Sequence, residues 1–426
     1  MNKLSLANPV GKQFLQTLKG FRDFLPKEAK KRQFVIESIK KTFETFGFEP
    51  LETPALEYQE VLLGKYGADA DKLIFKFQDQ GDRNVALRYD QTVPTSRVIA
   101  TNYQQLAMPW RRYQIQPVWR SENTQAGRYR EFLQCDADLF GSASPLADAE
   151  IVALSNAIYK NLGFKDYTIY INDRNILFEL MAYASIPENL HLAVISEIDK
   201  LDRKSQEEVA SELKSLGLTD TQIEHLYHHL DEAKPTEYLQ KVIDSAQNLG
   251  VPKEVISFHA RLARGLDYYT GTIFEIKVKG YEKGSVLGGG RYDNLIEKLS
   301  GVNIAAVGFA VGFDRTVEAM DELKLFMNAT KRTGILISIF SKELALDSLL
   351  VAGSLRSAGI ACELYPNDET KLDKQLKFAD KKGIKWLIVI GPDEAKNDQV
   401  VLKNLETGQQ EDVKLKDLIE KVVSNK

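Results

Sequence analysis

The sequence predicts an α+β protein made of several parts, and three observations support that fold class. The N-terminal half carries short strand signals arranged as hairpins, with helices between them. Residues 172–255 change to a charged helical periodicity with few strand signals, which indicates an inserted helical module. Residues 333–426 alternate strand and helix in the manner of a small parallel sheet, so we expect a compact α/β domain there.

The overall composition is that of an ordinary globular protein. The chain has 426 residues, of which 43% are hydrophobic and 27% are charged, enough for two or three domains. Its formal net charge of -4 gives no global basic footprint for nucleic acid. Any nucleic-acid partner must therefore be recognised by local patches and by shape.

Nothing in the sequence predicts contact with a membrane. The longest aliphatic run, Trp386–Ile390, is far shorter than a spanning helix, and the N-terminus lacks the apolar core of a secretory signal. Cys135 and Cys362 are too few and too far apart in sequence to suggest a disulfide framework or a cysteine zinc site. We therefore expect a cytoplasmic protein.

The first regular element expected is a helix that Pro26 opens and Gly47 ends. Its apolar residues fall on one stripe, which predicts a buried face: Ile36, Ile39, Phe43 and Phe46. Residues 48–54 then resemble a strand interrupted by prolines, the kind of edge that packs against a partner. A hairpin formed by residues 73–77 and 85–89 is expected next, followed by a helix that starts near Thr92.

The segment 120–141, RSENTQAGRYREFLQCDADLFG, places arginines before a run of amides and carboxylates. Its arginines offer planar, permanently charged forks that suit phosphate oxygens: Arg120, Arg128 and Arg130. Its later polar residues alternate as a strand would present them to one face: Gln134, Asp136 and Asp138. Gly127 interrupts the segment, so we expect strand, tight loop, strand. The chemistry suits polyphosphate at one end and an amine at the other, whereas an exposed hairpin of mixed charge is the plain alternative.

Three segments that bear glycine follow the helical module: residues 264–275, 287–295 and 305–315. Each combines glycines, which let backbone approach a ligand, with a nearby arginine. The last is a strand of small and apolar residues that runs into a helix whose first turn presents Arg315. That arginine lies along the outer phosphates of a nucleotide or caps a buried carboxylate; taken alone, the second reading is the plainer one.

In the C-terminal part, strands are expected at residues 334–340, 360–366 and 384–391. Helices are expected between them, at residues 344–358 and around 372–382. This order is that of a small parallel sheet with its connecting helices.

Six segments together resemble one family. The segment KGFRDFLP at Lys19–Pro26 is similar to its N-terminal signature, and GFEPLETPALE at 47–57 is similar to class II motif 1, a dimer-forming element. Segment 120–141 resembles motif 2, and GFAVGFDR at 308–315 resembles motif 3. LRYDQT at 87–92 and RGLDYYTG at 264–271 resemble histidine-site motifs. Over essentially its whole length the chain resembles the histidyl-tRNA synthetases, which are class II aminoacyl-tRNA synthetases.

The resemblance implies a particular domain organisation. A class II synthetase catalytic core, an antiparallel sheet flanked by helices, would occupy residues 1–171 and 256–327. A helical insertion at 172–255 would clamp the tRNA acceptor stem, and an α/β anticodon-binding domain would occupy 333–426.

The resemblance also implies an activity and its residues. The enzyme would use ATP, with Mg²⁺, to convert L-histidine to histidyl-adenylate and pyrophosphate, and would then pass histidine from the adenylate to the 3′ end of tRNA(His). It would act as a homodimer. The implied catalytic residues are Arg264 and Arg120. ATP would be bound by Arg120, Arg128 and Arg315. Histidine would be bound by Asp90, Gln91, Thr92, Arg120, Gln134, Asp138, Arg264, Tyr268 and Tyr269.

The chemistry explains why these residue types are needed. The carboxylate of histidine is ionised at neutral pH, so its attack on the α-phosphate requires no general base. Arginines stabilise the charge that builds on the phosphoryl oxygens, and carboxylates and amides accept from the ammonium group, for which the resemblance implies Asp90, Gln134 and Asp138. We expect no metal held by the protein itself, because His225 and His229 have metal-like spacing but no accompanying glutamate motif.

Two alternatives remain open from the sequence. A non-catalytic paralogue that regulates the first enzyme of histidine biosynthesis shares the core fold, but typically lacks the anticodon domain and degrades the RGLDYYTG segment. Other class IIa synthetases, for proline, threonine or glycine, share motifs 1 to 3 and the C-terminal domain but not the two histidine-site segments.

Overall fold

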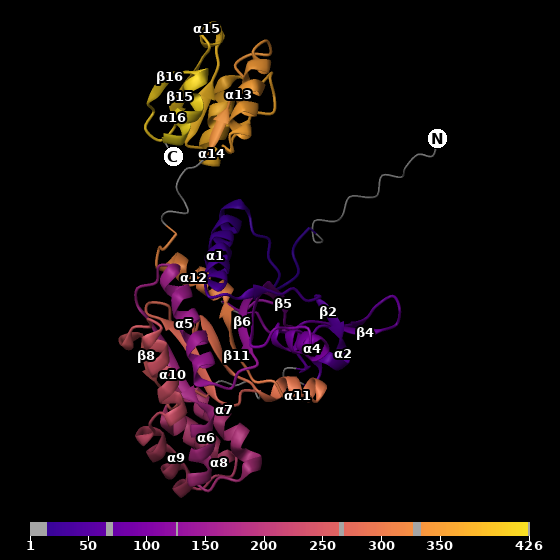
Figure 1. The fold of residues 1–426 in the computed structure, drawn as a ribbon, viewed down its shortest axis with the longest axis vertical. Coiled ribbons are helices and arrows are strands. Elements are labelled where there is room, and N and C mark those ends of the chain that lie inside the picture. The colour runs from indigo at the N-terminus through magenta and orange to yellow at the C-terminus, as the bar shows by residue number, and fades with distance from the viewer. Residues whose placement is uncertain (1–14, 65–70, 125–126, 264–267, 327–333, 425–426) are drawn as a thin grey trace. The chain divides into compact units, whose positions relative to one another are not determined.

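The computed structural model describes residues 15–64, 71–124, 127–263, 268–326 and 334–424. The chain divides into two compact units, Met1–Phe326 and Met327–Lys426, and each is described by itself (Figure 1).

An eight-stranded sheet forms the centre of the first unit, in the order β1-β5-β6-β11-β10-β9-β7-β8. Its strands are β1 (Glu49–Pro50), β5 (Trp110–Trp119), β6 (Glu131–Phe140), β7 (Tyr167–Asp173), β8 (Ile256–Phe258), β9 (Thr272–Val278), β10 (Leu287–Arg291) and β11 (Ala306–Gly312). The pairs from β5 through to β7 are antiparallel, whereas β1 and β8 pair in parallel with β5 and β7 at the two edges. The expected antiparallel sheet flanked by helices is confirmed.

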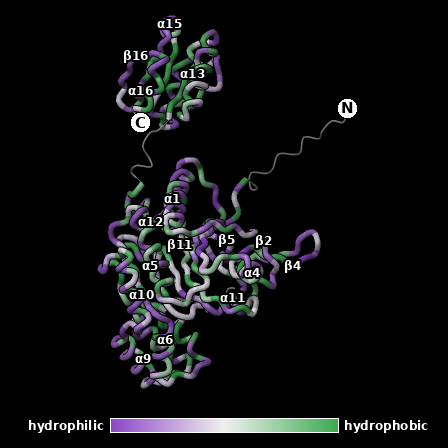
Figure 2. The backbone as a smooth tube through the Cα atoms, in the orientation of Figure 1, coloured by the Kyte–Doolittle hydropathy of each residue, from purple (hydrophilic) through white to green (hydrophobic). Residues whose placement is uncertain are grey.

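Three helices pack around this sheet: α1 (Pro26–Thr45), α5 (Pro145–Asn161) and α12 (Phe313–Glu322). In α1 the expected stripe is largely buried, because Ile39 and Phe43 are fully enclosed, while Ile36 and Phe46 are partly buried against the core. Figure 2 follows the alternation of hydrophilic and hydrophobic residues along α1. The helix ends just before Gly47, whose φ of 75° is a conformation that glycine adopts readily.

A smaller sheet, in the order β2-β4-β3, stands beside the main sheet. It contains β2 (Leu56–Tyr58), β3 (Lys76–Gln78) and β4 (Asn84–Leu87), and the helices α2 (Gln59–Leu62) and α4 (Thr92–Asn102) pack next to it. One face is buried, where Glu57 accepts two hydrogen bonds from Arg97 of α4. The expected hairpin and the following helix are both present.

The connection between β5 and β6 is longer than the tight loop that the sequence predicts. Strand pairing stops at Trp119 and Glu131, so the connection spans residues 120–130. At the base of this connection the Arg120 N–H still donates to the carbonyl of Arg130 at 2.9 Å, whereas the backbone N–H of Arg130 donates to the carbonyl of Gly20 at 3.0 Å. The residue before β6 is therefore bonded both to the end of β5 and to the N-terminal segment.

The helical insertion lies between β7 and β8. Its main helices are α6 (Arg174–Tyr183), α7 (His191–Ile198), α8 (Gln206–Ser215), α9 (Asp220–Glu232) and α10 (Glu237–Asn248). Figure 1 shows α6 to α9 gathered at one end of the unit. The last helix, α10, packs along α5 of the core, and the Tyr238 hydroxyl donates to Asp148 at 2.6 Å. That carboxylate also pairs with Arg291 inside the core, so the insertion is anchored to the sheet.

The second unit is a five-stranded sheet in the order β13-β12-β14-β15-β16. Its elements are β12 (Ile335–Ile337), α13 (Ala345–Ser357), β13 (Glu363–Leu364), α14 (Leu372–Lys382), β14 (Trp386–Val389), α15 (Pro392–Lys396), β15 (Gln399–Asn404), β16 (Gln410–Lys414) and α16 (Leu418–Ser424). The first three strands pair in parallel as expected, but β15 and β16 form an antiparallel hairpin that the sequence did not indicate.

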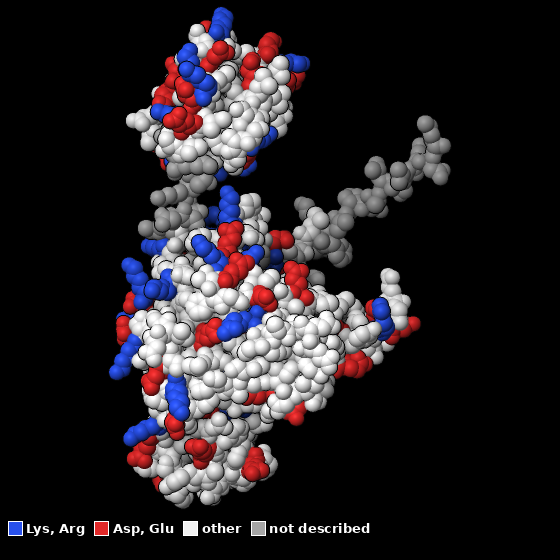
Figure 3. Space-filling model, viewed as in Figure 1, with Lys and Arg blue, Asp and Glu red and all other residues white. Residues whose placement is uncertain are grey.

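The surface carries charges of both signs. Figure 3 shows lysine and arginine interspersed with aspartate and glutamate over the visible face, in keeping with the small net charge. Among the described residues, no helix is both long and apolar enough to cross a membrane.

Candidate active site

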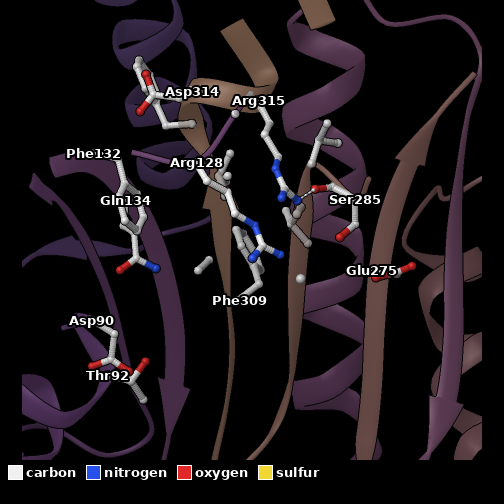
Figure 4. Close-up of a pocket in the computed structure, with 18 of the residues that line it drawn as sticks. Asp90, Thr92, Arg128, Phe132, Gln134, Glu275, Ser285, Phe309, Asp314 and Arg315 are labelled. Atoms are coloured by element: carbon white, nitrogen blue, oxygen red, sulfur yellow. Dashed lines mark hydrogen bonds between the residues drawn. The ribbon is translucent and has the colours of Figure 1, made fainter. Parts of the chain in front are cut away.

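A cavity of about 420 Å³ lies against the main sheet. Its walls come from β6, β10 and β11, from the first turns of α4 and α12, and from the connection between β5 and β6. In Figure 4, Arg128 and Arg315 point into the cavity from different elements, and Asp90 and Thr92 lie beneath Gln134. The cavity therefore has a cationic end and a polar end.

The cationic end contains the arginines of the two phosphate-type motifs. The Arg315 Nη1 donates to the carbonyl of Ser285 at 3.0 Å, which directs its guanidinium along the cavity wall. The Nε of Arg120 donates to the carbonyl of Tyr89 at 3.1 Å, and its guanidinium lies 4.2 Å from the centre of the Tyr89 ring. Arg128 reaches inward from the connection between β5 and β6, 3.7 Å from Glu122. Planar cations held in this way suit phosphate oxygens.

The N-terminal segment Lys19–Pro26 holds this end together. Asp314, the residue before Arg315, accepts hydrogen bonds from Arg22 at 2.8 Å and from Arg32 at 2.5 Å. The guanidinium of Arg22 also stacks 3.2 Å from the centre of the Tyr129 ring, in the connection that carries Arg128. Sequence reasoning singled out the segment as a signature but gave it no role.

The polar end is built from β6, the start of α4 and three tyrosines. Gln134 and Asp138 project from β6 into the cavity, and Asp90 accepts a hydrogen bond from the Val93 N–H at 3.1 Å, which orders the first turn of α4. Tyr268, Tyr269 and Tyr292 form one wall, on which the Tyr268 ring lies 4.9 Å from that of Tyr269 and 5.7 Å from that of Tyr292.

Buried acceptors concentrate on one face of β6. Gln134 Oε1 and Asp136 Oδ1 are enclosed and have no hydrogen-bond partner among the described residues. Burial raises the pKa of Asp136 well above its ordinary value, against the opposing pull of Arg112. Burial also raises the pKa of Asp138, while Arg112 and the Tyr292 hydroxyl oppose that rise. Buried acceptors without donors are costly, so a face that carries several of them is suited to a ligand rich in N–H groups.

A glycine makes room for the Asp138 carboxylate. Gly308 of β11 pairs with Asp138, and a Cβ on Gly308 would lie 1.9 Å from Asp138 Oδ1. No side chain fits there beside the carboxylate, so the GFAVGFDR segment serves the polar end through Gly308 and the cationic end through Arg315.

One predicted residue, Gln91, stands apart from the cavity wall. The Gln91 side chain is buried behind it, where Nε2 donates to the carbonyls of Gln116 at 2.8 Å and Gln134 at 3.2 Å, so it braces β5 and β6. Arg264 lies outside the described residues. The other predicted site residues all line the cavity: Asp90, Thr92, Arg120, Arg128, Gln134, Asp138, Tyr268, Tyr269 and Arg315.

The cavity also contains residues that sequence reasoning missed. Tyr292 lies in the glycine-rich segment GGGRYD, whose glycines indicate a close approach to a ligand but give no sign that the tyrosine faces it. Asp199 and Arg203 come from the insertion, and helical periodicity gives no sign of which turn meets the core. Among the described residues, no three His, Cys, Asp or Glu side chains are grouped so that they could hold a metal ion.

An antiparallel sheet that carries arginines at one end of a cavity and buried acceptors at the other defines the catalytic unit of a class II aminoacyl-tRNA synthetase. The sequence profile described as Histidyl-tRNA synthetase matches residues 20–316, and the profile described as Anticodon binding domain matches residues 335–425. The chain belongs to the histidyl-tRNA synthetase family.

Individual relatives agree with this assignment. A histidine--tRNA ligase of Cytophaga hutchinsonii is 38% identical over 448 residues, covering 95% of this chain and 98% of that protein. The crystal structure of histidyl-tRNA synthetase from Nostoc sp. PCC 7120 superposes with a TM-score of 0.84 at 30% identity, covering 96% of this chain and 99% of that one. A Bacillus halodurans structure, described as an ATP phosphoribosyltransferase regulatory subunit/histidyl-tRNA synthetase, has a TM-score of 0.71 at 26% identity and covers 85% of this chain and 96% of that one. The resemblance found in the motifs is confirmed.

Proposed function

We propose that the chain is a histidine--tRNA ligase, which activates L-histidine with ATP and transfers it to the 3′ end of tRNA(His). The observation that carries the proposal is the pairing of arginines at one end of the cavity with buried acceptors on β6 at the other. The first group matches a triphosphate, and the second matches an amino acid with several N–H donors.

In the activation step, a carboxylate oxygen of histidine attacks the α-phosphorus of ATP. The new bond joins that oxygen to phosphorus, and the bond from phosphorus to the bridging oxygen of pyrophosphate breaks. Arg120 neutralises charge on the α-phosphate, while Arg128 and Arg315 hold the outer phosphates of the magnesium complex of ATP. Arg264 is expected to act beside Arg120 on the α-phosphate, an assignment that rests on its motif.

The spacing along β6 orients the amino acid. Gln134 and Asp138 are four residues apart on β6, so their Cα atoms are separated by about 13 Å at the usual rise of a strand, too far for one ammonium group to contact both side chains easily. We therefore assign the ammonium group to Gln134 and Asp90. Asp138, beside Tyr268 and Tyr292, then receives an N–H of the imidazole, although the motif resemblance had placed Asp138 with the ammonium acceptors.

This orientation explains how histidine is selected. A pocket that hydrogen-bonds a polar group of its substrate rejects analogues without that group by roughly 10⁴-fold or more, because a buried group is then left unpaired. An imidazole N–H facing a buried carboxylate provides such discrimination.

Recognition of tRNA is assigned to the remaining parts. The match of residues 335–425 to an anticodon-binding domain supports a role for the second unit in reading tRNA. The insertion contributes Asp199 and Arg203 to the cavity, which supports a place beside the 3′ end of the tRNA. The two cysteine thiols of the chain, Cys135 and Cys362, are both free, in keeping with a cytoplasmic enzyme.

A homodimer is also part of the proposal. The short strand β1, which belongs to the motif 1 segment, forms one edge of the main sheet. Beside it, the small sheet turns Leu56, Tyr58 and Phe77 outward, with exposures of 42%, 54% and 45%. An apolar face of this kind suits a second copy. Sedimentation should give twice the mass of the chain, and a monomer at micromolar concentration would exclude this part of the proposal.

The direct test of the function is ATP–pyrophosphate exchange with each amino acid in turn. We expect exchange with histidine alone. The Bacillus halodurans likeness favours one rival, a regulatory subunit, which would give no exchange with any amino acid. Exchange with proline, threonine or glycine would instead indicate another class IIa synthetase.

A further inference from the structure

A fully buried arginine lies behind the polar end of the cavity. Arg112 of β5 has no exposed surface, and its Nη2 lies 2.5 Å from Asp138 Oδ2. Arg112 and Asp138 are direct cross-strand partners in the pairing of β5 with β6. Burying a guanidinium is expensive unless it is paired, so this position needs a reason beyond packing.

The Asp138 carboxylate is held from two directions. Arg112 approaches Oδ2, and the Tyr292 hydroxyl donates to Oδ1. Gly308 supplies the space in which the carboxylate lies. Arg112 is itself steadied by Gln114, whose Oε1 lies 3.5 Å from Nη1. The carboxylate therefore has one favoured orientation before any ligand arrives.

We propose that Arg112 is a positioning residue for the amino-acid site, which keeps the Asp138 carboxylate oriented and ionised so that it accepts an N–H from the substrate side chain. The inference rests on the proposed function and adds to it a residue that determines specificity. An ionised carboxylate is an acceptor only, so a ring without an N–H leaves it unpaired. Burial alone would favour the protonated carboxyl, which can donate and would tolerate such a ring.

Three variants test the proposal. Arg112→Gln removes the charge, and Arg112→Lys retains it. Arg111→Gln is the matched control, because Arg111 is the neighbouring residue of the same strand but pairs with Glu150 at 2.7 Å and lies outside the Asp138 network. For each variant, histidine-dependent ATP–pyrophosphate exchange gives KM for histidine and for ATP. Competition gives the inhibition constant of 2-thienylalanine, whose ring is of similar size and has no N–H.

We expect Arg112→Gln to raise KM for histidine about tenfold or more, the range for a lost hydrogen bond to a charged group. The preference for histidine over 2-thienylalanine should narrow by a similar factor. KM for ATP should stay within about twofold. Arg112→Lys should recover most of the loss, and Arg111→Gln should behave as the parent enzyme. A preference unchanged in Arg112→Gln, or KM values for histidine and ATP that rise together, would overturn the proposal.

Tyr292→Phe covers the case in which Arg112→Gln does not fold. This change removes the hydroxyl that donates to Asp138 Oδ1 and keeps the ring. The preference for histidine over 2-thienylalanine should narrow here also. An unchanged preference would overturn the role proposed for the two groups that hold the Asp138 carboxylate, Arg112 and Tyr292. Absence of histidine-dependent exchange by the folded parent enzyme would instead refute the proposed function, and this inference with it.

Discussion

The two ends of the cavity are built in different ways. At the cationic end, Arg128 extends from a loop with 44% of its side chain exposed, and the loop depends on contacts from the distant N-terminal segment. At the polar end, Gln134 and Asp138 project from the middle of a sheet and are 7% and 3% exposed. Phosphate binding needs charge and tolerates motion, whereas choosing one amino acid needs acceptors fixed in a dry environment.

This difference has a cost in stability. The buried face of β6 contains acceptors without partners among the described residues and carboxyl groups whose pKa values burial raises. At the cationic end, Arg120 and Arg315 donate to backbone carbonyls and Arg128 lies beside the Glu122 carboxylate. We infer that the polar end trades stability for specificity.

The largest effect should come from removing the space at the polar end. Gly308→Ala places a Cβ 1.9 Å from Asp138 Oδ1 and 2.6 Å from the carbonyl of Ala137. Displacement of the carboxylate should lower kcat/KM for histidine by more than about 100-fold, as misplacement by about 1 Å can do. Gly353→Ala in α13 is the control, since a Cβ there meets nothing within 4 Å. Steady-state exchange kinetics decide the matter, and equal activity in the two variants would contradict the packing described.

A smaller effect should follow at the cationic end from Arg22→Gln. Arg22 acts through Asp314 and Tyr129, so its loss should raise KM for ATP severalfold, less than about tenfold, and leave KM for histidine unchanged. Arg83→Gln breaks another arginine–aspartate pair, with Asp79 on the surface, and should change neither constant. A rise in KM for histidine alone would show that the N-terminal segment does not support the ATP-binding end of the cavity.

The smallest effect expected is a change in the pH dependence of stability. Because the pKa of Asp136 is raised in the folded state, the folded protein binds more protons than the unfolded one, and stability falls as pH rises from about 3.8 through the higher folded value. Asp136→Asn removes this loss. The free energy of unfolding of the variant in urea, relative to that of the parent protein, should therefore rise with pH. Asp79→Asn should show the opposite trend, because the hydrogen bond from Arg83 lowers the pKa of Asp79. A pH-independent difference for Asp136→Asn would mean that its carboxyl is not perturbed.

Local patterns predicted the parts of the site that lie on one strand. Alternation placed Gln134, Asp136 and Asp138 on a common face of β6, and the strand-to-helix pattern placed Arg315 on the first turn of α12. The connection before β6 was expected to be a tight loop, and the structure shows a longer one. The bond from Arg130 to Gly20 at its end joins residues far apart in the chain, so no local pattern could predict it. Arg112 was missed for the same reason: its meaning depends on a partner in another strand, which no pattern within β5 reveals.

The larger architecture divides in the same way. Helices such as α1 were predictable from their stripes, whereas the β15–β16 hairpin, which follows three parallel strands, was not. Which turn of the insertion reaches the cavity was also beyond prediction, since Asp199 and Arg203 are brought there by the packing of whole helices. Periodicity describes which face is buried but not what it is buried against.

The most direct test of the central claim compares Arg315→Ala with Gln134→Ala in ATP–pyrophosphate exchange over a matrix of histidine and ATP concentrations. If the cavity has a phosphate end and an amino-acid end, Arg315→Ala should raise KM for ATP about tenfold or more with little change for histidine. Gln134→Ala should raise KM for histidine about tenfold or more with little change in KM for ATP. Equal shifts of both constants in both variants would contradict the division of the cavity into two ends.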